Sequence, residues 1–357
     1  MKDVLVAGGG PAGLAAAIFA AKAGLSVAVM EPHEGAIDKA CGEGIMPAGR
    51  ILLDEMGVEL TTGRTFEGVR YHRLGSSAEG RFRNGPGLGV SRLELSDAMW
   101  RRARDLGVER LQGRVREVTQ ADGHVFAAGM KARWLIGADG LHSAVRQSLG
   151  IPLMRDRPGR FGIRRHFRTN EDSDFVDVYL GDTDEAYVTP LDYGLAGVAI
   201  ISVDPKRFED GLSQFDRLQD RLGDAVGGIQ GAGPFRRVST RAAVGRVALV
   251  GDAAGFLDPI TGEGIRLAFE AAQLAVDCVL SDSLDRYEAG WRRIMRRYLT
   301  VTSSLLFLRR HRYLLWGIVP TLRVAPFAFD WILGILGDAS TMRDSSSRTP
   351  DRVRGGL

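Results

Sequence analysis

The residues with the clearest chemistry follow the first apolar run of the chain. Gly8, Gly10 and Gly13 keep the spacing G-x-G-x-x-G, in which glycines allow a tight turn, a close backbone approach to phosphate and close packing of a helix on a strand. Glu31 ends the second apolar run, about twenty residues further on, where a carboxylate can accept hydrogen bonds from ribose hydroxyls. The pattern therefore predicts a dinucleotide site, and the acid would repel a ribose that carries a 2'-phosphate.

The segments around this turn are typical of a βαβ unit. Residues 4–7 and 26–30 are short apolar runs that indicate parallel strands covered on both faces. Residues 11–24 are rich in alanine, which is the best helix former. Pro11 and Ala12 open this helix, whose first backbone N–H groups can hold a phosphate. Strand, turn, helix and strand thus follow in the order that the dinucleotide motif requires.

Two further stretches extend the pattern. The sequence GADGLHSAVR (137–146) places Asp139 after an apolar run, and GDAAGFLDPITGEGI (251–265) places Asp252 after another. With the first turn, and in this order, they resemble the FAD-dependent monooxygenases of the para-hydroxybenzoate hydroxylase type. The resemblance implies an α/β fold with a Rossmann-like FAD-binding domain, an inserted antiparallel β-sheet substrate domain and C-terminal helices.

The same resemblance implies an activity. FAD would be the cofactor, and NAD(P)H and O2 would be co-substrates. The enzyme would hydroxylate or epoxidise a hydrophobic small molecule, aromatic or polyketide-like, through a flavin C4a-hydroperoxide, as in secondary metabolism. The protein's own part would be to position the substrate, exclude water and supply electrostatic support.

Several residues take expected roles at the cofactor. Asp252 can accept a hydrogen bond from a ribityl hydroxyl, and a helix start after it can stabilise negative charge on a reduced flavin. The resemblance gives Pro259 a place in a loop over the flavin, and it directs Arg92 toward the cofactor. On the same basis we expect cofactor contacts at Lys39, Val115, Asp139, Gly262, Gly264 and Ile265.

The loop KACGEGI (39–45) departs from the best-known hydroxylases, because Lys39 is its basic residue where they commonly have arginine. Cys41 and Gly42 are similar to the corresponding loop of geranylgeranyl reductases, which saturate prenyl chains on the same fold. The alternative function is therefore an FAD-dependent reductase of prenyl or lipid double bonds. A thiol at Cys41 can also be inert packing near the flavin.

Two other functions are weaker alternatives. Flavin-dependent halogenation would require a Trp-x-Trp-x-Ile-Pro element, which the sequence lacks. The other is a chain that retains FAD for structure and acts as a binding or regulatory partner; the intact acids at Glu31, Asp139 and Asp252 argue against loss of cofactor use.

The middle of the chain predicts the substrate side. Successive short strands between residues 161 and 202 indicate an antiparallel sheet inserted into the parallel domain. Arg164, His166 and Tyr187 lie on these strands and are candidates for contact with substrate, although alternation lets only one face point inward. The glycine-rich stretch 227–233 reads as a loop, so no second Rossmann unit for NAD(P)H is visible.

The predicted organisation has four parts. The FAD-binding domain is discontinuous over 1–65, 92–158 and 236–285, the substrate-binding sheet takes 66–91 and 159–235, helices take 286–337, and a disordered tail takes 338–357. We also expect a continuous helix from residue 204 to about residue 222.

Composition limits the class of protein. The 357 residues are 45% hydrophobic with a net charge of +3, which is ordinary for a globular enzyme and gives no sign of nucleic-acid binding. Two cysteines and six histidines have no metal-ligand spacing and fit a reducing cytoplasm. The apolar region 313–336 is too interrupted to span a membrane. Arginines interleave with large apolar residues in 291–320, a pattern that can give peripheral membrane contact.

Overall fold

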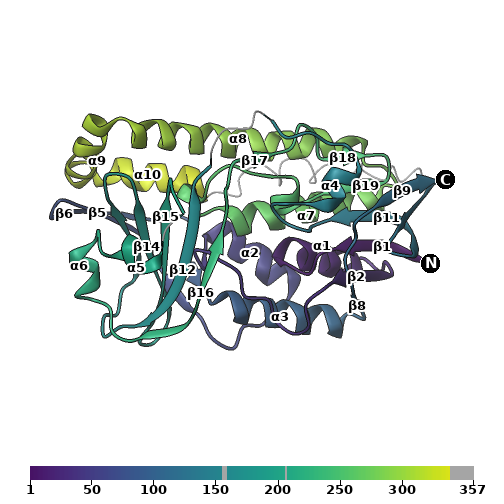
Figure 1. Cartoon of the computed structure of the whole chain (residues 1–357), viewed down its shortest axis with the longest axis horizontal. Coiled ribbons are helices and arrows are strands. Elements are labelled where there is room, and N and C mark those ends of the chain that lie inside the picture. Colours follow the sequence, from purple (N-terminus) through teal and green to yellow (C-terminus); the bar gives the residue numbers. More distant parts are fainter. Residues whose placement is uncertain (155–158, 206, 338–357) are drawn as a thin grey trace, which may run out of the picture.

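The computed structural model describes residues 1–154, 159–205 and 207–337, and it confirms the predicted mixed α/β fold class. Figure 1 shows a largely parallel sheet with its helices at one end of the molecule and an antiparallel sheet at the other. A layer of C-terminal helices runs along both. The predicted tail at 338–357 lies outside the described residues.

The first sheet is built on the predicted βαβ unit. Strand β1 (Lys2–Ala7) pairs in parallel with β2 (Val27–Glu31), and α1 (Pro11–Lys22) connects them. Because α1 is small and apolar on nearly every side, most of it is buried. The strand order is β18-β19-β11-β1-β2-β8, with a hairpin added at β11. These other strands are β8 (Glu109–Gln112), β9 (Val118–Ala121), β10 (His124–Ala127), β11 (Met130–Gly137), β18 (Ala243–Val244) and β19 (Val247–Leu249).

The register of this sheet brings the three motifs together. Ala7 ends β1 opposite Gly137 of β11, which in turn lies opposite Leu249 of β19. The turns that follow these strands therefore meet at one edge of the sheet, at the carboxyl ends where ligands bind in open α/β folds.

Helices surround that edge. Helix α1 packs against α3 (Arg92–Asp105) and α7 (Gly264–Leu280), and α2 (Pro47–Met56) packs on α7. The side chain of Ser91 accepts a hydrogen bond from the Glu94 N–H at 3.1 Å and so fixes the first turn of α3. Ser143 caps the short α4 (Ala144–Ser148) in the same way.

The second sheet has the order β16-β12-β15-β14-β13-β5-β6. Its strands are β5 (Gly68–Arg73), β6 (Ser76–Arg81), β12 (Phe161–Arg168), β13 (Phe175–Leu180), β14 (Glu185–Asp192), β15 (Leu195–Ser202) and β16 (Ala225–Ala232). All pairs are antiparallel except β13 with β5.

This sheet has two faces, which the register defines. The inner face carries the row Arg164, Ala199, Tyr187, Val178 and Tyr71. The outer face carries the alternate residues and is covered by the short helices α5 (Phe208–Leu212) and α6 (Asp216–Gln219), whose apolar side chains join its core.

Three helices complete the chain. Helix α8 (Asp285–Arg310) crosses the top of Figure 1 above both sheets, and α9 (Arg312–Val324) and α10 (Pro326–Gly337) lie at the end with the second sheet. Phe329 and Leu333 of α10 join one apolar cluster with the inner-face residues Val69, Val176 and Val178. Among the described residues, no helix combines the length and apolar character needed to cross a membrane.

Short elements connect these layers. They are β3 (Gly44–Ile45), β4 (Arg64–Phe66) and β7 (Gly87–Gly89) in one small sheet, β17 (Arg237–Val238) paired with β20 (Gly255–Phe256), and the 3₁₀ turns η1 (Gly251–Ala253) and η2 (Pro259–Thr261).

Two predictions of local structure were wrong. The stretch 227–233, predicted as a loop, lies largely in strand β16, an edge strand whose side chains are mostly exposed, so no apolar alternation marks it. The helix predicted at 204–222 is divided into α5 and α6, where Gly211 and Ser213 are poor helix formers. The domain boundaries stay a prediction.

Candidate functional site

The glycine turn is forced by close contacts. A Cβ on Gly13 would lie 1.9 Å from the carbonyl oxygen of Gly8, and one on Gly9 would lie 2.5 Å from Cζ2 of Trp100. Gly8 has a φ of +104°, and its Cβ would meet the Ala138 carbonyl oxygen at 2.5 Å. Because side chains are excluded at all three positions, α1 begins directly against the turn after β11.

The carboxylate of Glu31 fixes the glycine turn. Its Oε2 accepts a hydrogen bond from the Gly9 N–H at 2.7 Å, and its Oε1 accepts from the His33 N–H at 3.0 Å. Although burial alone would raise the pKa of the Glu31 carboxyl, these hydrogen bonds and one with the His33 ring lower it. Lone pairs remain on both oxygens for ribose hydroxyls, so the structure adds a positioning role to the predicted one.

Arg92 faces the start of α1 from α3. Its side chain is 5% exposed, yet its Nη1 has no hydrogen-bond partner in the described part of the chain. A Cβ on Gly10 would have one neighbour within 4 Å, the Nη2 of Arg92 at 3.9 Å. Burial lowers the pKa of Arg92, and the negative charges of Asp38 and Glu43 oppose that shift. A buried guanidinium with an unpaired nitrogen thus lies at a helix N-terminus, which is the chemistry of an anion site.

The third motif closes the same space. A Cβ on Gly251 would lie 2.7 Å from the Cβ of Ala12, so the turn after β19 touches α1. The Asp252 side chain is exposed and lines a recess together with Gly251 and Gly264. Desolvation by the walls of this recess raises the pKa of the carboxyl, while the charges of Lys39 and Arg92 lower it. The predicted residues Lys39, Arg92 and Asp252 therefore lie within electrostatic reach of one another.

The loop from Pro259 to Gly264 lies beside this acid. Asp258 begins it by accepting a hydrogen bond from the Ile260 N–H at 3.0 Å, and Arg160 forms a two-pronged ion pair with the same carboxylate. Gly262 has a φ of +67°, and a Cβ there would lie 2.8 Å from Cε of Met46. The loop is thus packed on the segment that follows Cys41, and Ile265 begins α7 behind it.

The Cys41 loop is clamped to the inner face by Glu43, which is 1% exposed and adopts a φ of +58°. Its carboxylate accepts from the Arg92 backbone N–H at 2.8 Å and pairs with Nε2 of His166 at 2.8 Å. Arg164 adds a third contact, since its Nη2 lies 3.6 Å from Oε1. The clamp joins the start of α3, the cofactor loop and strand β12.

Space for Glu43 is provided from β15. A Cβ on Gly197 would lie 2.5 Å from Oε2 of Glu43, so only glycine leaves room for the carboxylate. Thr189 on β14 donates a hydrogen bond to the Gly42 carbonyl at 2.7 Å. Arg164 also pairs with Asp38. Arg164 and His166 therefore anchor the cofactor loop in this structure.

Tyr187 lies on the same face but outside this cluster. Its hydroxyl donates to Oε2 of Glu185 at 2.8 Å, and its ring packs with the apolar inner face. Burial raises the pKa of this phenol, and the charge of Glu185 raises it further. Tyr187 is thus a neutral hydrogen-bonding group between the apolar cluster and Glu185, which is buried and paired with Arg160 and Arg309.

Asp139 and Val115 were also predicted to contact the cofactor. Asp139 accepts hydrogen bonds from the Ala144 and Val145 N–H groups through Oδ2, while its buried Oδ1 has no partner among the described residues. Val115 is buried in the main core. Glu43 and Trp100 were not predicted from the sequence. Gly197, a glycine within the apolar strand 195–202, could have indicated that another group approaches this strand closely, and that group is Glu43.

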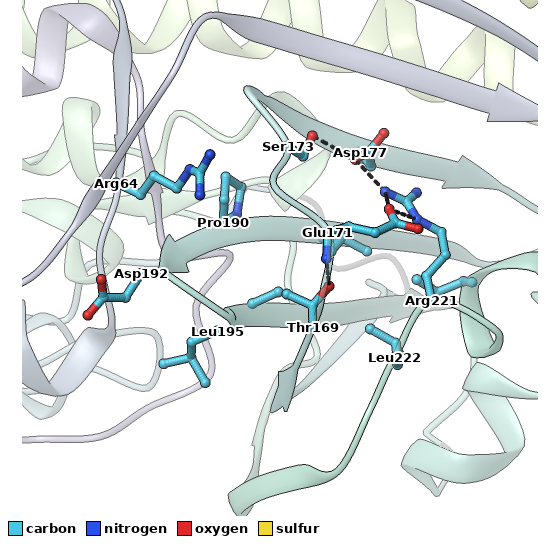
Figure 2. A pocket seen from close by; sticks show the side chains of 13 residues that line it. Arg64, Thr169, Glu171, Ser173, Asp177, Pro190, Asp192, Leu195, Arg221 and Leu222 are labelled. Carbon is cyan, nitrogen blue, oxygen red and sulfur yellow. Dashed lines mark hydrogen bonds and ion pairs between the residues drawn. The ribbon is translucent and has the colours of Figure 1, made fainter.

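A pocket on the outer face is separate from this site. Figure 2 shows it between Arg64, Pro190, Leu195 and Leu222, with Arg221 paired to Glu171 and Asp177. Asp177 and Val188, which line it, alternate along their strands with inner-face residues. Within the described residues, no group of three or more His, Cys, Asp or Glu side chains could hold a metal ion.

The inner site fits FAD. Its glycine turn admits no side chain, its unpaired buried guanidinium suits a pyrophosphate, and an unpaired oxygen of Asp139 and the accessible carboxylate of Asp252 suit hydroxyl groups. The fold and the site thus define an FAD-binding flavoprotein.

Comparison with known proteins agrees. Two models described as FAD binding domain match residues 3–78 and 109–279. The chain is 30% identical over 360 aligned residues to a menaquinone reductase of Mycobacterium tuberculosis, covering 84% of each protein. It therefore belongs to the family of FAD-dependent oxidoreductases that includes this reductase.

Other relatives carry different activities. The chain is 28% identical to a digeranylgeranylglycerophospholipid reductase of Thermoplasma acidophilum over 76% of each protein. It is 26% identical to a para-nitrophenol 4-monooxygenase of a Pseudomonas strain, covering 86% of this chain and 87% of that protein. A crystal structure of a flavoprotein/dehydrogenase from Cytophaga hutchinsonii shares the fold, with a TM-score of 0.82 at 18% identity over 94% of this chain and 92% of the other.

Proposed function

We propose that this protein is an FAD-dependent reductase that saturates a carbon–carbon double bond in the prenyl chain of a lipid, with NAD(P)H as the electron source. The observation that carries the proposal is the Cys41 loop, which Glu43 clamps between Arg92 of the anion site and the apolar inner face. The names of two relatives, which act on menaquinone and on a digeranylgeranyl lipid, support it.

The chemistry at this loop suits an apolar substrate. Burial raises the pKa of the Cys41 thiol, and the charge of Glu43 raises it further, so the group stays neutral at physiological pH. Gly42 has no protein atom within 4 Å of the position of a Cβ, which leaves its backbone open to a cofactor ring. Neither residue presents a charge to a hydrocarbon chain.

An apolar cluster lies beside the site on the inner face. Val69, Val176 and Val178 are buried in it against apolar residues of α9 and α10, with Tyr71 and Tyr187 at its margin. A prenyl chain has no polar group along its length, so we propose that it binds by apolar contact at this margin. When bound, reduced FAD supplies a hydride equivalent for one alkene carbon, and a proton completes the reduction at the other.

The test is anaerobic turnover by the FAD-loaded protein. Geranylgeraniol and a short-chain menaquinone would be incubated with NADPH or NADH without O2, and products would be analysed by mass spectrometry. The proposal expects a product that has gained two hydrogen atoms in its prenyl chain. For the menaquinone, the ring would be re-oxidised by air before analysis, so that reduction of the quinone is not counted. Cys41→Ala should slow this reaction, whereas Cys278→Ser, which changes the other free cysteine on α7, should not. A product that has gained oxygen, formed only in air, would overturn the proposal.

Monooxygenation is the second candidate. The ordered motifs and the buried Arg92 support it, as does the relative named for para-nitrophenol. The same incubation in air distinguishes the two reactions, because oxygen transfer consumes O2 and adds one oxygen atom to the product. A cytoplasmic location stays a prediction.

A further inference from the structure

Large apolar side chains lie on the outside of the C-terminal helices. Val324 ends α9 with 85% exposure, and Phe327 and Trp331 on α10 are 72% and 59% exposed. Phe327 and Trp331 are four residues apart and therefore lie on one side of α10, and Val324 ends the helix that precedes it. The opposite side of α10 carries Phe329 and Leu333, which are 1% and 2% exposed. Helix α10 is thus apolar on both sides, although only one packs against the protein.

Basic side chains flank this exposed side. Arg323 precedes Val324 and is exposed, and Arg83 is exposed with its Cδ 3.8 Å from the Cβ position of Gly334 on α10. Neither arginine belongs to an ion pair of the described residues. We call Arg83, Arg323, Val324, Phe327 and Trp331 the docking surface.

The docking surface connects with the inner face through α10 itself. The ring of Phe329 stacks on Tyr71 with centroids 5.2 Å apart and an angle of 8° between the planes. Tyr71 pairs across the sheet with Val178, and Val178 pairs with Tyr187. One apolar cluster therefore extends from the back of the docking surface to the candidate substrate site.

We infer that the docking surface binds the interface of an anionic lipid bilayer, from which the protein takes its substrate. Aromatic rings enter the headgroup region of a bilayer, and neighbouring arginines pair with anionic lipid. The chemistry of the substrate rests on the proposed function, but binding to the bilayer does not. The positive charge beside the apolar stripe favours an anionic membrane over a second copy of this chain.

Vesicle co-sedimentation of the FAD-loaded full chain tests the inference. Vesicles of phosphatidylcholine with phosphatidylglycerol would be compared with pure phosphatidylcholine. We expect wild-type protein to bind the anionic vesicles more tightly and to lose binding as salt increases. Phe327→Gln with Trp331→Gln should weaken binding to both by roughly tenfold or more. Arg83→Gln with Arg323→Gln should weaken binding to anionic vesicles alone, by about fivefold for each arginine.

The matched control carries Phe126→Gln and Leu280→Gln, which change exposed apolar residues near the first sheet. Circular dichroism and thermal melts would verify that every variant folds. The inference is overturned if wild-type protein stays in the supernatant, if the control variant loses as much binding as the docking variants, or if gel filtration shows a dimer that Phe327→Gln with Trp331→Gln dissociates.

Activity on detergent-dispersed substrate separates this inference from the proposed function. Without vesicles, the docking variants should reduce dispersed substrate at the wild-type rate and lose activity only on substrate held in vesicles. If dispersed substrate is never reduced while vesicle binding persists, the proposed reductase function fails and the docking surface stands.

Discussion

Replacement of Arg92 by methionine should have opposite effects on cofactor binding and on stability. The side chain is 5% exposed, and its Nη1 has no hydrogen-bond partner among the described residues. In the protein without FAD, it is a desolvated cation that the negative charges of Asp38 and Glu43 offset only in part. Methionine has a similar length and carries no charge, so it removes this cost while it also removes the proposed partner of the pyrophosphate.

The two magnitudes can be estimated separately. Loss of hydrogen bonds to a charged group costs about 1.5–3 kcal/mol, which corresponds to a tenfold to hundredfold loss of FAD affinity, roughly. Removal of a buried, unsatisfied donor returns about 1–3 kcal/mol to the FAD-free protein, which should raise its Tm by a few degrees. The Arg92 backbone N–H that holds Glu43 is unchanged, so the clamp persists.

Titration of FAD-free protein with FAD, followed by flavin fluorescence, and thermal melts with and without FAD would measure both effects. The matched control is Arg73→Met, because Arg73 is 6% exposed but donates to the carbonyls of Leu180 and Gly181 at 3.0 Å. That variant should lose stability and keep its FAD affinity. An Arg92→Met protein with unchanged FAD affinity, or one less stable than wild type without FAD, would refute the assignment of Arg92 to the pyrophosphate.

Four more predictions concern residues of the site. Gly13→Ala should abolish FAD binding, because its Cβ would lie 1.9 Å from the Gly8 oxygen, whereas Gly228→Ala should not; the flavin absorbance of purified protein reports this. Glu31→Gln should be less stable than wild type at neutral pH, because the folded-state pKa of Glu31 lies below its ordinary value. The difference in urea unfolding should decrease as the pH falls through the ordinary range of a glutamate and should disappear below the lowered folded-state pKa. Asp252→Asn should stabilise the FAD-free protein at neutral pH, because desolvation raises the folded-state pKa of Asp252 and its ionised carboxylate therefore destabilises the folded state. This advantage should disappear in acid, where Asp252 is protonated in the folded and the unfolded protein. Asp252→Ala should reduce turnover by about a hundredfold while weakening FAD binding much less; steady-state kinetics beside FAD titration would show the split.

Much of the cofactor site could be predicted because its parts are local in sequence. A strand, a glycine turn and a helix N-terminus specify a phosphate site within a dozen residues or so. Parallel strands place their carboxyl ends at one edge, so Asp139 and Asp252 had to come near the first turn. The contacts of Gly8 with Ala138 and of Gly251 with Ala12 are the physical result.

The substrate side could not be predicted to the same extent, because its contacts join distant segments. Glu43 and His166 are 123 positions apart, and no local pattern encodes their pairing. Strand β16 carries glycines and exposed side chains, so it is held by backbone pairing to β12 that periodicity does not reveal. Such pairing depends on the register of the whole sheet.

The clamp also changes how Arg164 and His166 are interpreted. Residue type and strand position suggested groups that contact substrate, but both pair with acids of the cofactor loop, Arg164 with Asp38 and His166 with Glu43. Removing one partner of a buried ion pair costs about 3–5 kcal/mol, because the remaining charge stays desolvated. The loop that carries Cys41 is therefore held against the inner face by the protein alone. Since this contact joins α3 of the first layer to strand β12 of the second sheet, the candidate cofactor site and the inner face are held in a fixed relation by the protein itself.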